Sequence, residues 1–99
     1  MLIEVFGRHI EITEDMKELV EKTLETALKP FPNAVQSAKV IVSLENYLIE
    51  TEAVVVLKTQ KVLTATTKDK EFRTAIHSLE KKLNEQIRRL KEKIENHRA

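Results

Sequence analysis

The residues of this chain that stand out chemically are cations near its C-terminus. Lys82, Gln86, Arg89 and Lys93 follow one another at steps of four, three and four residues. At about 100° per residue, these steps place the residues along one side of a helix. A row of cations without stacking aromatics suits contacts to phosphate groups, which position a nucleic acid without reading its sequence. The pattern therefore predicts a helical surface for structured RNA.

The charged residues of the chain are distributed unevenly, with the surplus of cations in the same C-terminal part. The formal net charge is only +1, but residues 68–99 contain 10 Lys and Arg against 6 Asp and Glu, whereas residues 1–67 contain 7 against 10. Such an asymmetry is typical of a polyanion-binding surface on the last third of the chain. A solvated helix with a surplus of lysine is the alternative explanation of the same composition.

Catalytic and metal-binding chemistry has little support in the sequence. The histidines His9, His77 and His97 lie far apart, and none pairs with another at the i,i+3 or i,i+4 spacing of helical zinc ligands. The chain has no cysteine, which excludes disulfides and cysteine-ligated zinc, and a single glycine cannot build a glycine-rich phosphate loop. We therefore expect a protein that is not an enzyme and that has no metal site and no cofactor.

The elements that must position the basic row are indicated by hydrophobic periodicity. Apolar residues at every second position predict strands, and steps of three and four predict helices. Thr13 is a suitable N-cap for the first helix, and Pro30 ends it. The expected elements are a strand over 2–6 that ends at Gly7, a helix over 14–29, strands over 38–45 and 49–58, a third strand after 59–60 and a long helix from 69 onward.

This order, β-α-β-β-β-α, predicts an α+β fold with a four-stranded sheet and two helices packed on one face. The arrangement is similar to a double-stranded-RNA-binding domain with an additional N-terminal strand. An RNA-recognition motif is excluded, because its sheet needs stacking aromatics that these strands lack. We expect one domain over residues 1–96 and a short tail over 97–99. No apolar run approaches the roughly 18 residues of a membrane span, so we expect a cytoplasmic protein without a membrane partner.

The opposite face of the predicted sheet carries an aliphatic set: Ile41, Val54, Val56 and Val62. Such a face permits a weak homodimer or another protein partner. The hairpin tip at Tyr47, Leu48 and Ile49 offers a second apolar surface. A protein-interaction module that acts through one of these surfaces is therefore the alternative to an RNA-binding protein.

Two separate segments resemble one known family in register. The stretch Phe6–Lys22 is similar to the opening of the ribosome hibernation promoting factor and ribosome-associated inhibitor family, also called sigma-54 modulation proteins. In the long helix, the family pattern is matched by Ala75-Ile76, Leu79, Lys82-Leu83, Gln86-Ile87, Arg89, Lys91 and Lys93. The resemblance covers essentially the whole chain and implies the same β-α-β-β-β-α fold.

The resemblance also implies a function. It predicts a stress or stationary-phase factor that binds the rRNA of the small ribosomal subunit in the channel of mRNA and tRNA, competes with both and inactivates the ribosome. The rRNA-binding residues that it implies are Lys22, Lys82, Gln86, Arg89, Lys91 and Lys93. Lys81 and Arg88 are additional basic candidates without a firm motif match. The chain is expected to be a short form of the family, and an N-terminal domain cut from a long form would have the same sequence.

The basic row and the apolar stripe of the long helix are expected to have separate roles. Lys82 and Arg89 lie off the stripe that contains Leu83. Charge reversal at these two positions is therefore expected to leave thermal stability nearly unchanged, because exposed charges contribute little to it.

Overall fold

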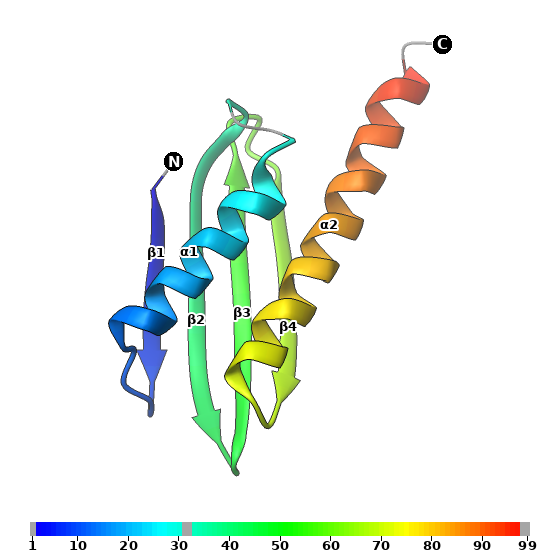
Figure 1. The fold of residues 1–99 in the computed structure, drawn as a ribbon. Helices are drawn as coiled ribbons and strands as arrows, with labels where there is room; N and C mark the ends of the chain where they lie inside the picture. The colour runs from blue at the N-terminus through cyan, green and yellow to red at the C-terminus, as the bar shows by residue number, and fades with distance from the viewer. Residues whose placement is uncertain (1, 31–32, 98–99) are drawn as a thin grey trace.

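The computed structural model describes the backbone of residues 2–30 and 33–97, and the side chains of these ranges up to residue 90. Two helices cover one face of a four-stranded sheet, and the other face is open (Figure 1). The elements are β1 (Ile3–Arg8), α1 (Glu14–Leu28), β2 (Val35–Glu45), β3 (Leu48–Leu57), β4 (Val62–Asp69) and α2 (Phe72–His97). The element order and the α+β fold predicted from the sequence are confirmed.

The strands lie in the order β1-β2-β3-β4. β2, β3 and β4 are joined by tight turns and pair antiparallel, as short connections require. β1 pairs parallel with β2, with Val5 opposite Val40. A parallel pair needs a crossover connection, and α1 provides it. β4 is therefore one edge of the sheet, and α2 follows it directly in the chain.

Local chemistry sets the start of α1 and the end of β1. The N–H of Met16 donates to Oγ1 of Thr13 at 3.2 Å, which confirms the predicted N-cap. β1 does not end at Gly7, as the sequence indicated, but continues to Arg8. A Cβ at Gly7 would collide with the carbonyl oxygen of Ile10. This glycine therefore lets the chain fold back tightly beside β1, and it does not break the strand.

The core lies between the helices and the covered face of the sheet. Its largest fully buried members come from both helices and from the two central strands: Val20, Leu24 and Leu28 of α1, Val40, Val42 and Val55 of the sheet, and Ile76, Leu79 and Leu83 of α2. Leu44 is an exception to the predicted alternation. It continues the inward pattern of β2 but is 40% exposed, because the end of the β2–β3 hairpin extends beyond the two helices (Figure 1).

Buried hydroxyls join the start of α2 to the sheet. Oγ1 of Thr67 donates to the carbonyl oxygen of Ala75 at 2.9 Å. Since that bond uses the only hydroxyl proton of Thr67, Oγ1 of Thr51 donates in the 2.5 Å contact between the two threonines. This chain of hydrogen bonds fixes the first turn of α2 on β3 and β4, and thereby the direction in which the rest of the helix runs.

α2 is considerably longer than the strand that it covers. Its 26 residues span about 39 Å at 1.5 Å per residue, whereas the 8 residues of β4 span about 26 Å. The C-terminal part of α2 consequently projects beyond the sheet (Figure 1). None of the helices described is long and apolar enough to cross a membrane.

Candidate nucleic-acid interface

Two residues of the predicted basic row contact the backbone of the edge strand. Nζ of Lys82 donates to the carbonyl oxygen of Thr66 at 2.5 Å. Nε2 of Gln86 donates to the carbonyl oxygen of Thr64, also at 2.5 Å. Both residues therefore lie on one side of α2, as the four-residue step between them predicted, and the structure shows that this side faces β4. We call this surface, which also includes Arg89, the β4 side of α2.

The two hydrogen bonds are possible because helix and strand rise by matching amounts. Four residues of an α-helix advance about 6 Å, and two residues of a strand advance about 6.6 Å. Lys82 and Gln86 are thus separated by nearly the same distance as Thr66 and Thr64. These carbonyl groups belong to the outer edge of β4, which has no further strand to pair with. The side chains of α2 therefore cover part of this sheet edge.

The bonds to β4 leave both side chains able to bind a ligand. An ammonium group has three donors, and Lys82 uses one of them for Thr66. The amide of Gln86 has a second N–H and a carbonyl oxygen beyond the N–H that Thr64 accepts. A long side chain that is already held in place loses less conformational entropy when it binds a phosphate. The β4 side of α2 thus presents positioned donors.

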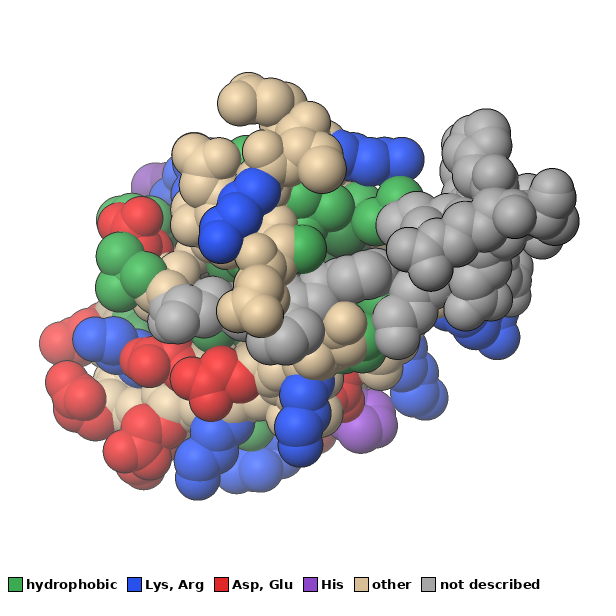
Figure 2. Space-filling view, turned by 90° about the horizontal axis from the view of Figure 1, so that it is seen from above, with side chains coloured by type: hydrophobic (Ala, Val, Ile, Leu, Met, Phe, Trp, Pro, Cys, Tyr) green, Lys and Arg blue, Asp and Glu red, His purple; other side chains and the backbone are tan. Residues whose placement is uncertain are grey.

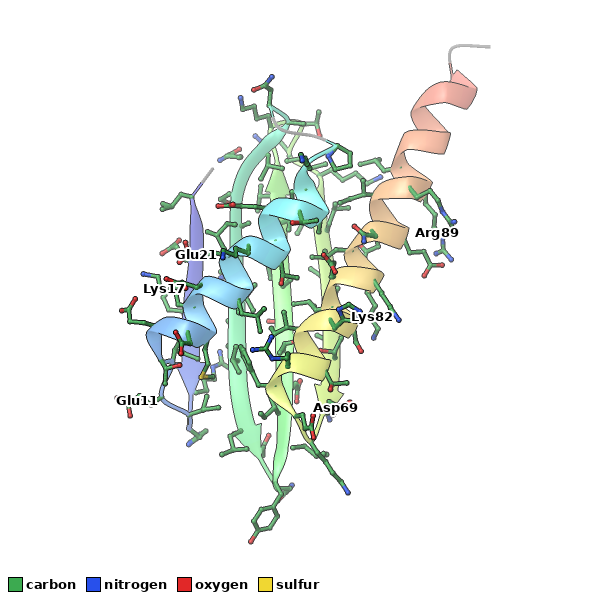
Figure 3. All side chains as sticks on the ribbon, in the orientation of Figure 1. Glu11, Lys17, Glu21, Asp69, Lys82 and Arg89 are labelled. Carbon is green, nitrogen blue, oxygen red and sulfur yellow. The ribbon has the colours of Figure 1, made fainter. Side chains whose placement is uncertain are left out.

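Arg89 extends the β4 side by another turn. Its Nη2 donates to Oε1 of Glu85 at 2.9 Å, one turn earlier on the helix. The ion pair offsets part of its charge but leaves most of the five guanidinium donors free. Lys82 and Arg89 both project from α2 in Figure 3.

Lys61 is a basic residue of this region that sequence reasoning missed. It lies at the turn between β3 and β4, and lines a shallow groove together with Leu63, Gln86, Arg89 and Leu90. The structure therefore brings a cation from the sheet to the β4 side of α2. The sequence signal for Lys61 is indirect, because it requires knowing that α2 runs along β4 and that the fourth and fifth turns of α2 reach this hairpin.

The additional candidates Lys81 and Arg88 lie on a different side of α2. Together with Asn84 and Glu85 they line a separate shallow depression on the outer surface of the helix. Lys81 also borders an open groove between the helices, to which Leu19 of α1 and His77 contribute. The structure thus divides the predicted basic residues between two surfaces.

Lys22 is separated from both surfaces. It is exposed on α1, whose 15 residues include five acidic ones: Glu14, Asp15, Glu18, Glu21 and Glu25. Seen from above, acidic side chains gather over the α1 end of the helical layer and basic ones toward α2 (Figure 2). The electrostatic surroundings of Lys22 therefore oppose a polyanion more than those of Lys82 do. The side chains of Lys91 and Lys93 lie outside the described residues, as does the end of the predicted tail over 97–99.

The hydrogen bond of Lys82 changes what we expect for the stability of a charge-reversal variant. Charge reversal of Lys82 and Arg89 was expected to leave stability nearly unchanged, because both lie off the apolar stripe. The structure shows that Lys82 is bonded to the sheet edge, so its replacement removes a contact between α2 and β4. Arg89 makes only a surface ion pair within its own helix, which contributes little.

The open face of the sheet carries the predicted aliphatic set. Val54 and Val56 of β3 are half-buried, and Val62 of β4 is 51% exposed. Phe6, which the sequence reading did not include, joins them by pairing with Ile41 across β1 and β2. Within the described part of the chain, no group of three His, Asp or Glu side chains is placed to hold a metal ion.

The fold and the basic edge define a class: an α+β domain whose long helix presents cations beside an edge strand. The comparisons identify the family within this class. Residues 3–95 match the family described as "Sigma 54 modulation protein / S30EA ribosomal protein", and the chain belongs to this family. This family makes the protein a ribosome-associated protein and not an enzyme.

Solved structures show the same fold. A ribosomal subunit interface protein from Coxiella burnetii superposes with a TM-score of 0.84 at 22% identity, over 92% of this chain and 98% of that one. The N-terminal domain of Protein Y from Thermus thermophilus superposes with a TM-score of 0.76 at 26% identity, over 88% of this chain and 94% of that one. No curated protein sequence matches the chain.

Proposed function

We propose that this protein binds the rRNA of the small ribosomal subunit through the β4 side of α2, in the channel that mRNA and tRNA occupy, and thereby inactivates ribosomes under stress or in stationary phase. The observation that carries the proposal is the pair of side chains, Lys82 and Gln86, held at fixed spacing along the edge of β4. Arg89 and Lys61 add positive charge along the groove that Gln86 lines. The site of action is accordingly the cytoplasm.

The chemistry of this surface suits rRNA backbone better than a specific sequence. Cationic and amide donors bind phosphate oxygens and riboses, which fix the position of the protein on a folded RNA. Among the described residues, Phe6 is the single aromatic residue on the open face of the sheet. This face therefore lacks the aromatic platform on which sheet-based RNA-binding domains stack bases. Shape and charge, and not base readout, would therefore select the binding site.

Cell-free translation tests the proposal. Wild-type protein should lower the rate of synthesis in proportion to ribosome occupancy, and excess mRNA or tRNA should displace it. The Lys82→Glu/Arg89→Glu variant should inhibit at least tenfold less well at equal concentration. The matched control is Lys17→Glu/Lys39→Glu, which changes the net charge equally at exposed positions of α1 and β2. Undiminished translation on fully occupied ribosomes would refute the proposed mechanism.

A further inference from the structure

The turn between β2 and β3 holds a tyrosine in an unfavourable backbone conformation. Glu45 pairs with Leu48, which leaves Asn46 and Tyr47 as a two-residue loop. Their φ angles are 51° and 63°. A two-residue loop with positive φ at both positions is a type I′ turn, for which Asn-Gly is the favoured sequence. Asn46 fits its position, whereas Tyr47 occupies the position that glycine suits best.

Among the described residues, no packing of the Tyr47 ring offsets the unfavourable backbone. Tyr47 is 94% exposed, so its ring contributes no packing to the domain. Leu44 and Leu48 beside it are 40% and 36% exposed. Half of the six exposed large hydrophobic side chains in the described part of the protein therefore lie at this one tip. An unfavourable backbone combined with an exposed aromatic ring is characteristic of a binding residue.

The surrounding charges indicate which kind of partner the tip fits. Glu45 and Glu50 flank a small depression beside Leu48. Nζ of Lys68 lies 3.8 Å from Oε2 of Glu50 and offsets part of its charge. An apolar tip with acidic neighbours repels a phosphate backbone and attracts a basic protein surface. Tyrosine between two leucines also has the composition of an anchor that enters an apolar pocket of a protein.

The tip is well placed to act together with the β4 side of α2. Thr66, which accepts from Lys82, pairs with Glu52 of β3. Glu52 lies four strand residues beyond Leu48, the first residue after the turn, which corresponds to about 13 Å. The hairpin end and the far end of α2 point in opposite directions along the molecule (Figure 1). A single ribosomal subunit can therefore contact the basic helix with one of its components and the apolar tip with another.

We propose that the Leu44–Leu48 tip, with Tyr47 as its anchor, docks on a basic ribosomal protein of the small subunit while α2 contacts rRNA. This inference rests on the proposed function. According to this proposal, binding through α2 depends strongly on salt. Binding through the tip does not, since burial of an apolar anchor releases no counterions.

Tyr47→Gly tests the inference without loss of structure. The change creates the favoured Asn-Gly turn, so the midpoint of thermal unfolding should rise by a few degrees. Co-sedimentation with purified small subunits should nevertheless weaken at least tenfold, and the slope of log K against log salt should stay that of wild type. The control Leu2→Ser removes a side chain that is 75% exposed elsewhere and should bind as wild type does.

A photo-crosslinking phenylalanine analogue at position 47 identifies the partner. A crosslink to a basic ribosomal protein supports the inference, and a crosslink to rRNA overturns it. Equal binding by wild type and Tyr47→Gly overturns the role of the tip but leaves the proposed function of α2 in place. Wild-type protein that fails to sediment with small subunits overturns the proposed function and the docking of the tip together.

Discussion

Replacement of Lys82 by methionine should destabilise the domain, whereas the same replacement at Lys81 should not. Methionine keeps an unbranched apolar stem and has a similar helix propensity, so the main loss at position 82 is the bond to the carbonyl oxygen of Thr66. A hydrogen bond contributes about 0.5–1.5 kcal/mol, and here the charged ammonium donor strengthens the bond while access of water to the exposed carbonyl weakens it, so the middle of this range applies. We expect a loss of about 1 kcal/mol for Lys82→Met.

Thermal and urea unfolding measure this loss. For a domain of this size, 1 kcal/mol corresponds to a shift of about 4–8 °C in the unfolding midpoint. Lys81→Met removes the same charge from the adjacent exposed position and should change the midpoint by less than about 2–4 °C, since surface substitutions usually stay within 0.5 kcal/mol. Equal midpoints for the two variants would show that the contact between Lys82 and β4 does not stabilise the fold.

Three further changes test other parts of the molecule. Leu83→Ala should cost about 2–5 kcal/mol in denaturant unfolding because Leu83 is fully buried on the side of α2 that packs in the core, and a loss below 1 kcal/mol would contradict this packing. Lys22→Glu should weaken co-sedimentation with small subunits less than Lys82→Glu does, and the reverse order would move the interface to α1. Val54→Lys should abolish weak self-association through the open sheet face in analytical ultracentrifugation, and a wild-type protein that is strictly monomeric at high concentration would refute that association.

Much of the fold follows from local patterns in the sequence. Alternating apolar residues defined the strands, and Thr13 and Pro30 marked α1, because these signals act within a few residues of the chain. The role of Gly7 was misread as a strand end, since its close neighbour Ile10 becomes visible only in the folded turn. Leu44 was misplaced because alternation specifies a face of the sheet but not how far the helices cover it.

The candidate site was predictable only as a side of a helix. Helical spacing placed Lys82 and Gln86 together, and the structure confirms that they share one side. Their bonds to β4 depend on how α2 lies along the edge strand, which the buried hydroxyl of Thr67 helps to set. Lys61 joins the surface through the same tertiary placement, and no local pattern in the sequence indicates it.

The salt dependence of binding to small subunits tests the central proposal most directly. Each phosphate contact contributes about 0.7–0.9 to the slope of log K against log salt. Lys82→Gln/Arg89→Gln should therefore flatten the slope by about 1.4–1.8. Lys17→Gln/Lys39→Gln removes equal charge at exposed positions away from the β4 side of α2 and should keep the wild-type slope. A wild-type slope for the Lys82 and Arg89 variant would contradict phosphate binding by this surface.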